Sequence, residues 1–214
     1  MSGALPAVVV AVALGYLSGS LAWGLWLTRG PRGVDIRTVG SRNIGATNVY
    51  RVFGPALGVP VLLLDALKGA VPVLVVPGLA VCAAFPGGRA WCALAVAAAA
   101  VAGHVWTCFA GFKGGKGVAT AAGVLIALAP LAFGVSAAVF VLAVTITRFI
   151  SVGSMLGALA FPIAYALLGG GVAQPPFLLG VLIALVVVFT HRENLARLAR
   201  GEERRFSLRR GGAR

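Results

Sequence analysis

Long apolar stretches alternate with short polar segments along most of this chain. The stretches are rich in Ala, Val, Leu, Ile and Phe, and glycine, proline or charged residues interrupt them; they cover residues 4–28, 54–80, 90–110, 118–147, 154–168 and 176–190. A helix of roughly 20 apolar residues crosses the ~30 Å hydrocarbon core of a bilayer. The pattern therefore predicts an all-α integral membrane protein.

The stretch 118–147 is too long for a single span. Its 30 residues would reach about 45 Å as one helix. Pro130 and Gly134 lie near its middle, and a proline removes a backbone hydrogen bond from a helix interior. We therefore expect two short spans here, which makes the fold a seven-transmembrane-helix bundle.

The positive charges predict the orientation of this bundle. Residues 4–28 are apolar for longer than the core of a signal peptide, so they are expected to remain as the first span, and the first cation, Arg29, follows them. Lys and Arg are enriched in cytoplasmic loops, which places the N-terminus outside and the C-terminus in the cytoplasm. We expect a transmembrane domain over residues 1–191 and a basic cytoplasmic tail over 192–214.

The composition supports a membrane protein and argues against nucleic acid as a partner. Hydrophobic residues make up 60% of the chain and charged residues only 11%, compared with about 25% charged in soluble domains. The formal net charge of +13 comes mostly from residues in the loops between apolar spans and in the tail, as the positive-inside rule explains. The three cysteines lack the spacing of a metal site, so we expect no metal and no cofactor.

The polar loop after the first stretch has the composition of an anion-binding segment. Its glycines, including Gly40 and Gly45, allow a concave turn of backbone N–H groups. Neutral donors accompany them, and Arg51 offers a bidentate fork for phosphate; the donors are Ser41, Asn43, Thr47 and Asn48. The alternative is a capped turn whose arginines contact lipid headgroups.

A second basic loop has the sequence Lys113-Gly114-Gly115-Lys116 and comes just before an expected helix. A helix N-terminus flanked by lysines attracts phosphate through its N–H groups, its dipole and the ammonium charges. The segment is not a Walker A motif, because Lys116 is followed by glycine and not by Ser or Thr. The alternative is that the glycines allow close packing and the lysines anchor the topology.

Several polar residues fall inside the apolar stretches. His104 is expected near the cytoplasmic end of its span, either as a general base or as a hydrogen-bonding residue between helices. Asp65 and Lys68 are three residues apart and can pair on one helical face, which favours a structural role. For Ser20 and Gly24 the alternatives are packing between helices and lining a cavity, and the small residues favour packing.

These motifs together resemble the bacterial acyl-phosphate-dependent glycerol-3-phosphate acyltransferases of the PlsY type, over most of the chain. The resemblance is carried by Gly33–Arg37, Val39–Ser41, Asn43–Val49 with Arg51, Asp65 with Lys68–Gly69, Gly103–His104, Phe112–Thr120, Arg148 with Ser151, and His191–Arg192 with Asn194. The chain departs from the family pattern at Arg42, which replaces a usual glycine, at Leu21-Ala22, where a proline is frequent, and at Glu202, which replaces a threonine.

The resemblance implies transfer of a fatty acyl group from acyl phosphate to the 1-hydroxyl of sn-glycerol 3-phosphate, at the cytoplasmic face of the bacterial plasma membrane. The products are lysophosphatidic acid and phosphate. In this interpretation Lys113 and Lys116, with the amides of Gly114 and Gly115, neutralise phosphate, and either His104 or the leaving phosphate takes the proton. The implied substrate-binding residues are Ser41, Asn43, Gly45, Thr47, Asn48, Arg51, Ser151, His191 and Asn194. The rival interpretation is a membrane transporter of an organic phosphate.

Overall fold

The computed structural model describes residues 3–206, and every regular element within that range is a helix. The chain divides into two compact units, one ending at Ala127 and the other beginning at Leu128. This confirms the predicted all-α class. Residues 207–214 of the predicted basic tail lie outside the described range.

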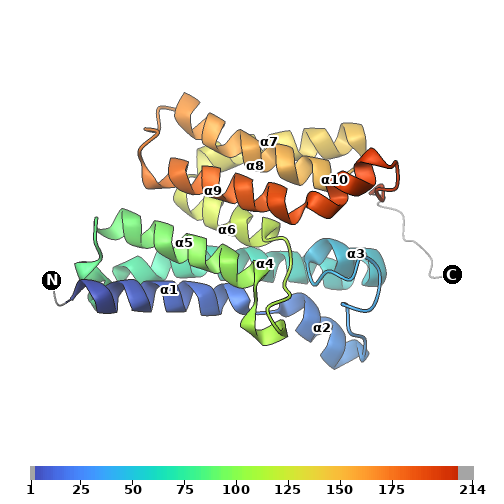
Figure 1. Cartoon of the computed structure of the whole chain (residues 1–214), viewed down its shortest axis with the longest axis horizontal. Helices are drawn as coiled ribbons and strands as arrows, with labels where there is room; N and C mark the ends of the chain where they lie inside the picture. The colour runs from blue at the N-terminus through green and yellow to red at the C-terminus, as the bar shows by residue number, and fades with distance from the viewer. Residues whose placement is uncertain (1–2, 207–214) are drawn as a thin grey trace. The chain divides into compact units, whose positions relative to one another are not determined.

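The first unit contains the two polar loops. Its helices are α1 (Ala4–Ser20), α2 (Trp23–Arg32), α3 (Ala46–Phe53), α4 (Pro55–Val75), α5 (Arg89–Val105) and α6 (Val118–Leu128, whose last residue belongs to the second unit), with 3-10 turns η1 (Val76–Gly78), η2 (Ala80–Ala84) and η3 (Cys108–Ala110). Helices α1 and α5 lie side by side, in blue and green in Figure 1. The first loop connects α2 to α3, and the second connects α5 to α6.

Glycines let the helices of this unit approach each other closely. A Cβ at Gly19 of α1 would overlap the Ala100 carbonyl of α5, and a Cβ at Gly123 of α6 would overlap the Ala66 carbonyl of α4. Close backbone contact of this kind helps helices associate in lipid. Lipid tails are as apolar as the side chains, so no hydrophobic driving force brings the helices together there. Gly24 also packs closely, but against the first loop and not against a helix as predicted, since a Cβ there would overlap the carbonyl of Ile44.

The second unit consists of α7 (Pro130–Thr147), α8 (Ile150–Leu167), α9 (Pro175–Thr190) and α10 (Arg192–Ala199). Helices α7 and α8 pack along their lengths, and the Ser136 hydroxyl donates to the Gly157 carbonyl at 2.6 Å. The expected break in 118–147 is confirmed, because α6 ends at Leu128 and Pro130 is the first residue of α7. Proline is favoured at that position, where its missing N–H leaves no helical bond unmade.

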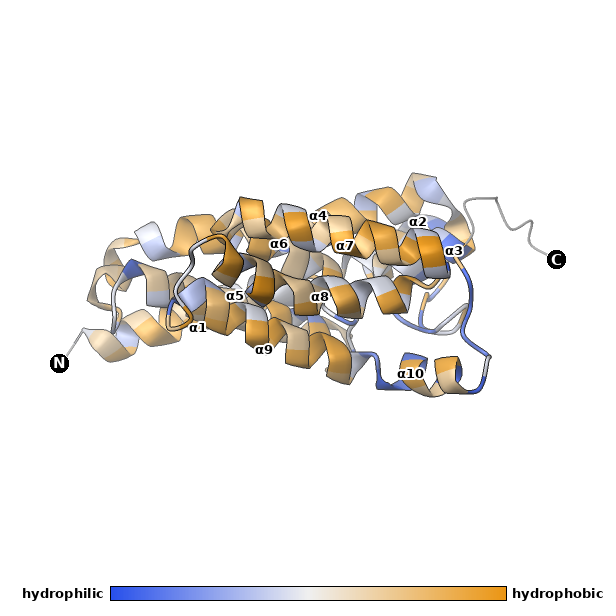
Figure 2. Cartoon of the chain, turned by 90° about the horizontal axis from the view of Figure 1, so that it is seen from above, coloured by the Kyte–Doolittle hydropathy of each residue, from blue (hydrophilic) through white to orange (hydrophobic). Residues whose placement is uncertain are grey.

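Within residues 3–206, five helices are long and apolar enough to cross a membrane, and a sixth if α9 and α10, which meet at a bend of 53°, count as one span. Helix α6 is apolar but shorter, with 11 residues. Figure 2 shows apolar colour along most of the long helices and polar colour around α2, α3 and α10. Several membrane helices are therefore present, whereas the count of seven and the orientation stay predictions.

Candidate functional site

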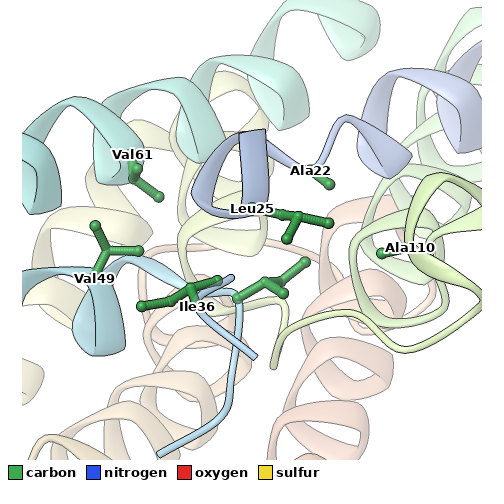
Figure 3. Packing of buried hydrophobic residues seen from close by; sticks show 7 residues of the cluster. Ala22, Leu25, Ile36, Val49, Val61 and Ala110 are labelled. Carbon is green, nitrogen blue, oxygen red and sulfur yellow. The ribbon is translucent and has the colours of Figure 1, made fainter. Parts of the chain in front are cut away.

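The two polar loops of the first unit share one hydrophobic core. Ile36 and Ile44 come from the first loop, Val49 from α3 and Ala110 from the turn that precedes the second loop. These side chains cluster with Ala22, Leu25 and Val61, as Figure 3 shows for the labelled residues. The loops therefore lie at the same end of this unit.

Asn48 holds the first loop in shape from the inside. Its side chain is 2% exposed, and its Oδ1 accepts from the Ser41 backbone N–H at 2.8 Å. Its Nδ2 donates to three loop carbonyls, those of Ile36, Val39 and Asn43, at 3.3, 3.2 and 2.9 Å. One side chain of α3 thus closes the loop, and this is a positioning role that the sequence pattern did not reveal.

The loop enters α3 through a short side-chain turn. Asn43 Oδ1 accepts from the Gly45 N–H at 2.9 Å, and the Gly45 carbonyl accepts from the Asn48 N–H at 3.0 Å. The next N–H groups, at Ala46 and Thr47, belong to the first turn of the helix, where no acceptor exists within the helix itself. Ser41 is exposed and Thr47 half-buried beside this turn. The arrangement suits an anion.

Arg42 adopts a left-handed backbone conformation with φ of 59°. Only glycine occupies this region without steric cost, because the Cβ of other residues crowds the following carbonyl. Arg42 is one of the positions at which the chain departs from the family pattern, and the usual glycine would fit this backbone conformation best. Arg42 keeps the turn and adds a cation to it.

A local ion pair stands at the beginning of the same loop. Arg37 Nη2 lies 2.7 Å from Asp35 Oδ2, and the Arg37 backbone N–H donates to Asp35 Oδ1 at 2.9 Å. These hydrogen bonds lower the pKa of Asp35 from 3.8 to about 2. The pairing was not predicted, although the spacing of two residues between an acid and an arginine is visible in the sequence.

The second loop is held by its main chain. The Gly114 N–H donates to the Val105 carbonyl and the Gly115 N–H to the His104 carbonyl, each at 3.0 Å. A Cβ at Gly114 would overlap the His104 carbonyl oxygen, and one at Gly115 would overlap His104 Nε2. These two amides bond α5, which corrects the expectation that they supply free donors; the glycines are needed for close packing.

Donors of the second loop are instead expected where α6 begins. Gly117 has φ of 79°, and its carbonyl accepts the first helical bond from Ala121 N–H at 2.8 Å. The N–H groups of the first turn of α6 point toward the loop, as in any helix. Lys116 is half-buried beside this turn, and Lys113 is exposed. A helix N-terminus with two ammonium groups provides a favourable potential for phosphate.

His104 is buried behind this loop, at 3% exposure. Its Nδ1 forms a hydrogen bond with Thr120 Oγ1 at 3.0 Å and lies 3.8 Å from Asp65 Oδ1. The predicted pair of Asp65 and Lys68 is confirmed, with 2.7 Å between Lys68 Nζ and Asp65 Oδ1. No local pattern in the sequence indicates that Asp65 lies near His104, because this contact joins α4 to α5.

The second unit brings together two of its three predicted site residues. Ser151 Oγ donates to Glu203 Oε1 at 2.8 Å, and Asn194 Nδ2 donates to the same oxygen at 2.6 Å. The third residue, His191, is buried at the junction of α9 and α10, with Nδ1 2.7 Å from the Val187 carbonyl oxygen.

Glu203 is the organising residue of this cluster. Arg197 Nε donates to Glu203 Oε2 at 2.9 Å. Partial burial alone would raise the pKa of Glu203, but hydrogen bonds from Asn194, Arg197 and Ser151 outweigh it and lower the pKa. From the sequence, Glu203 was expected only as part of the basic tail over 192–214. An acid within a strongly basic segment was the signal that could have identified it.

The geometry of the two loops is suited to holding anions. Among residues 3–206 no group of three His, Cys, Asp or Glu side chains is placed to hold a metal ion. Two loops at one end of the first unit combine helix N-termini, hydroxyls and cations. Such an arrangement can align two phosphorylated molecules and stabilise charge on a leaving phosphate.

Comparison with known proteins gives consistent matches. The glycerol-3-phosphate acyltransferase family model matches residues 9–201. A glycerol-3-phosphate acyltransferase of Desulforudis audaxviator is 44% identical over 95% of this chain and 98% of that protein. The one from Geobacter sulfurreducens is 48% identical over 92% of this chain and 97% of its own length.

Solved structures agree with these matches. The crystal structure of PlsY (YgiH), an integral membrane glycerol 3-phosphate acyltransferase, in its glycerol 3-phosphate form has a TM-score of 0.82 and 36% identity, covering 94% of this chain and 96% of that one. A second PlsY structure, the lysophosphatidic acid form, has a TM-score of 0.80 and 35% identity, with the same coverage. These matches favour an acyltransferase over the transporter.

Proposed function

This chain belongs to the glycerol-3-phosphate acyltransferase family and is an integral membrane acyltransferase, and we propose that it acylates the 1-hydroxyl of sn-glycerol 3-phosphate with acyl phosphate as the donor. The products are then lysophosphatidic acid and inorganic phosphate. Support comes from the similarity to PlsY, whose solved forms carry glycerol 3-phosphate or lysophosphatidic acid.

One observation carries the proposal: the shared core of Ile36, Ile44, Val49 and Ala110. It keeps the loop that leads into α3, which carries Arg51, and the loop that contains Lys116 at the same end of the first unit. Both substrates of the proposed reaction carry a phosphate, and two neighbouring anion-binding loops would hold them side by side.

In the proposed reaction the protein needs no covalent nucleophile. The glycerol hydroxyl attacks the acyl carbonyl, the bond from carbonyl carbon to phosphate oxygen breaks, and phosphate departs with the electron pair. Lys113 and Lys116 stabilise the departing charge. Ser41, Thr47 and Arg51 bind phosphate, while Asn43, Gly45 and Asn48 shape their loop. The proton goes to the leaving phosphate or to His104.

Three further assignments remain part of the proposal. Ser151, His191 and Asn194 are assigned to substrate binding, with Glu203 holding Ser151 and Asn194 in place. The variant Ser151→Ala tests this assignment. It lacks the hydroxyl, so a raised KM would report a lost contact with substrate.

The topology is likewise proposed. Seven spans, with α6 as a short one, would place both loops and the tail in the cytoplasm, with the N-terminus outside and the protein in the bacterial plasma membrane. Cysteine substitutions at Arg42 and at Gly87, modified from one side of sealed vesicles, test it. Labelling of both from the same side would overturn it.

The decisive experiment compares donors. Purified protein is incubated with glycerol 3-phosphate and acyl phosphate, acyl-CoA or an acyl carrier protein thioester. We expect lysophosphatidic acid and stoichiometric phosphate from acyl phosphate. Preference for a thioester would overturn the donor assignment. Acylation of plain glycerol at the same rate as glycerol 3-phosphate would overturn the assignment of the acceptor.

A further inference from the structure

The buried ion pair of α4 is costly to keep inside a membrane helix. Asp65 is 2% and Lys68 5% exposed, one helical turn apart on the same face. Charges at membrane depth are expensive, and an apolar pair of similar volume is often at least as stable as a buried ion pair. The pair therefore calls for a role beyond stability.

Lys68 reaches the break between α1 and α2. Its Nζ donates to the Leu21 carbonyl at 2.6 Å, and the Lys68 carbonyl accepts from Ser18 Oγ at 2.8 Å. Leu21 follows the last residue of α1 and has ψ of 113°, so it has left the helix. A carbonyl released by a helix break needs a new donor in lipid, and the ammonium group provides it.

The break sets the direction of α2, and α2 supports the first loop. Gly24, in the first turn of α2, packs so closely on the loop that a Cβ would overlap the Ile44 carbonyl oxygen. Ile44 belongs to the shared core, and its neighbour Asn43 begins the turn into α3. Displacing the Leu21 carbonyl would therefore displace the first loop.

Asp65 faces the support of the second loop. Its Oδ1 lies 3.8 Å from His104 Nδ1, in contact with the ring but beyond hydrogen-bond distance, and that nitrogen forms its hydrogen bond with Thr120 Oγ1. The His104 carbonyl accepts from Gly115 N–H, and the ring packs on Gly115. The position of the histidine thus sets the position of the loop between Lys113 and Lys116.

We propose that Asp65 and Lys68 form a positioning pair that fixes the spacing between the two loops, by contacting the supports of both at once. This inference rests on the proposed function, in which two phosphorylated substrates must be aligned. Reacting atoms must approach within about 3.5 Å, and a displacement of about 1 Å costs on the order of a hundredfold in rate. Neither residue touches substrate in this role.

The test separates positioning from stability with a charge-neutral variant, Asp65→Leu/Lys68→Met. Either single substitution leaves a buried unpaired charge and is expected to unfold the protein at lower temperature. The double variant leaves no unpaired charge and loses only the hydrogen bond to the Leu21 carbonyl, so it should unfold in detergent at a higher temperature than either single variant. We expect its kcat to fall at least about tenfold, with KM for both substrates within about threefold.

A second variant, Lys68→Arg, decides the question if the double variant does not fold. Lys68→Arg keeps the charge balance, but the planar guanidinium cannot hold the Leu21 carbonyl and Asp65 at the ammonium's distances. We expect a lowered kcat here too. The matched control is Ser136→Ala, which removes a buried link between α7 and α8; it should lower the unfolding temperature and leave kcat unchanged.

Two outcomes would overturn the proposal: wild-type kcat in a folded double variant or in Lys68→Arg, or a raised KM with unchanged kcat. Failure of the proposed function gives a different result. If the wild-type protein used a thioester donor, the donor assignment would be wrong, yet the same variants compared with that donor would still decide the role of the pair.

Discussion

The two loops of the first unit reach similar chemistry by opposite means. The first loop is closed by a side chain, because Asn48 bonds one N–H and three carbonyls of the loop. The second is closed by its own backbone, because Gly114 and Gly115 donate to α5 and leave no room for a Cβ. A lost side chain should therefore harm the first loop, and an added one the second.

This difference follows from what each loop lies against. The first loop is preceded by α2 and followed by the short helix α3, and an amide side chain with donors and an acceptor can satisfy several irregular backbone groups. The second loop packs on the end of α5, where His104 and Val105 present carbonyls. The final carbonyls of any helix lack partners within it, so a glycine loop can bond them directly.

The cations of the two loops give the largest expected effect. Arg51→Ala and Lys116→Ala should each lower the rate of acyl transfer by a hundredfold to about a thousandfold, since each removes a positive charge that binds or stabilises a phosphate. Membrane insertion should be unchanged. Product formation by the purified variants measures this, with Arg89→Ala, at the start of α5, as the control. Near-normal rates in either variant would reject its role.

Gly115→Ala probes the backbone-held loop. The added Cβ would overlap His104 Nε2, so the loop must shift away from α5. We expect a loss of about a hundredfold in kcat/KM, because the lysines on either side move with it. Gly30→Ala is the control, since a Cβ at Gly30 meets nothing within 4 Å. Equal activity of the two variants would contradict the close packing.

Asn48→Ala probes the side-chain-held loop. Three loop carbonyls and one N–H lose their partner, so the free energy of unfolding should fall by about 2 to 4 kcal/mol. We expect a rise in KM of about tenfold for a phosphorylated substrate as the loop loosens. Thr38→Ala, which removes one exposed hydrogen bond, is the control. An unchanged KM would show that the loop keeps its shape without Asn48.

The smallest expected effect is the loss of stability at acidic pH when Asp35 becomes protonated. The pKa of Asp35 is lowered to about 2 in the folded protein, so its ionised form stabilises the fold above pH 3.8 and this contribution is lost as the pH falls toward 2. The pair is partly exposed, so the contribution is at most about 1 kcal/mol. Thermal unfolding of Asp35→Asn and wild type at pH 7 and pH 3 measures it; the difference between the two proteins should shrink at pH 3. A constant difference would contradict the pairing.

The apolar pattern was sufficient for the helical class and for the break at Pro130, because span length and proline chemistry are local properties. Local motifs likewise identified the two loops and the pairing of Asp65 with Lys68, which needs only helical spacing. The expectation for the amides of Gly114 and Gly115 was wrong, since a glycine loop near a helix start does not show in sequence which way its N–H groups point.

The sequence by itself determined which segments are apolar, where the cations gather and which residues resemble a known family. Only the tertiary structure decided that Asn48 closes the first loop, that Asp65 reaches His104 and that Glu203 gathers Ser151 with Asn194. The physical reason is distance along the chain. Hydropathy and helix breaks depend on neighbouring residues, whereas these contacts join separate elements and form only when the helices pack.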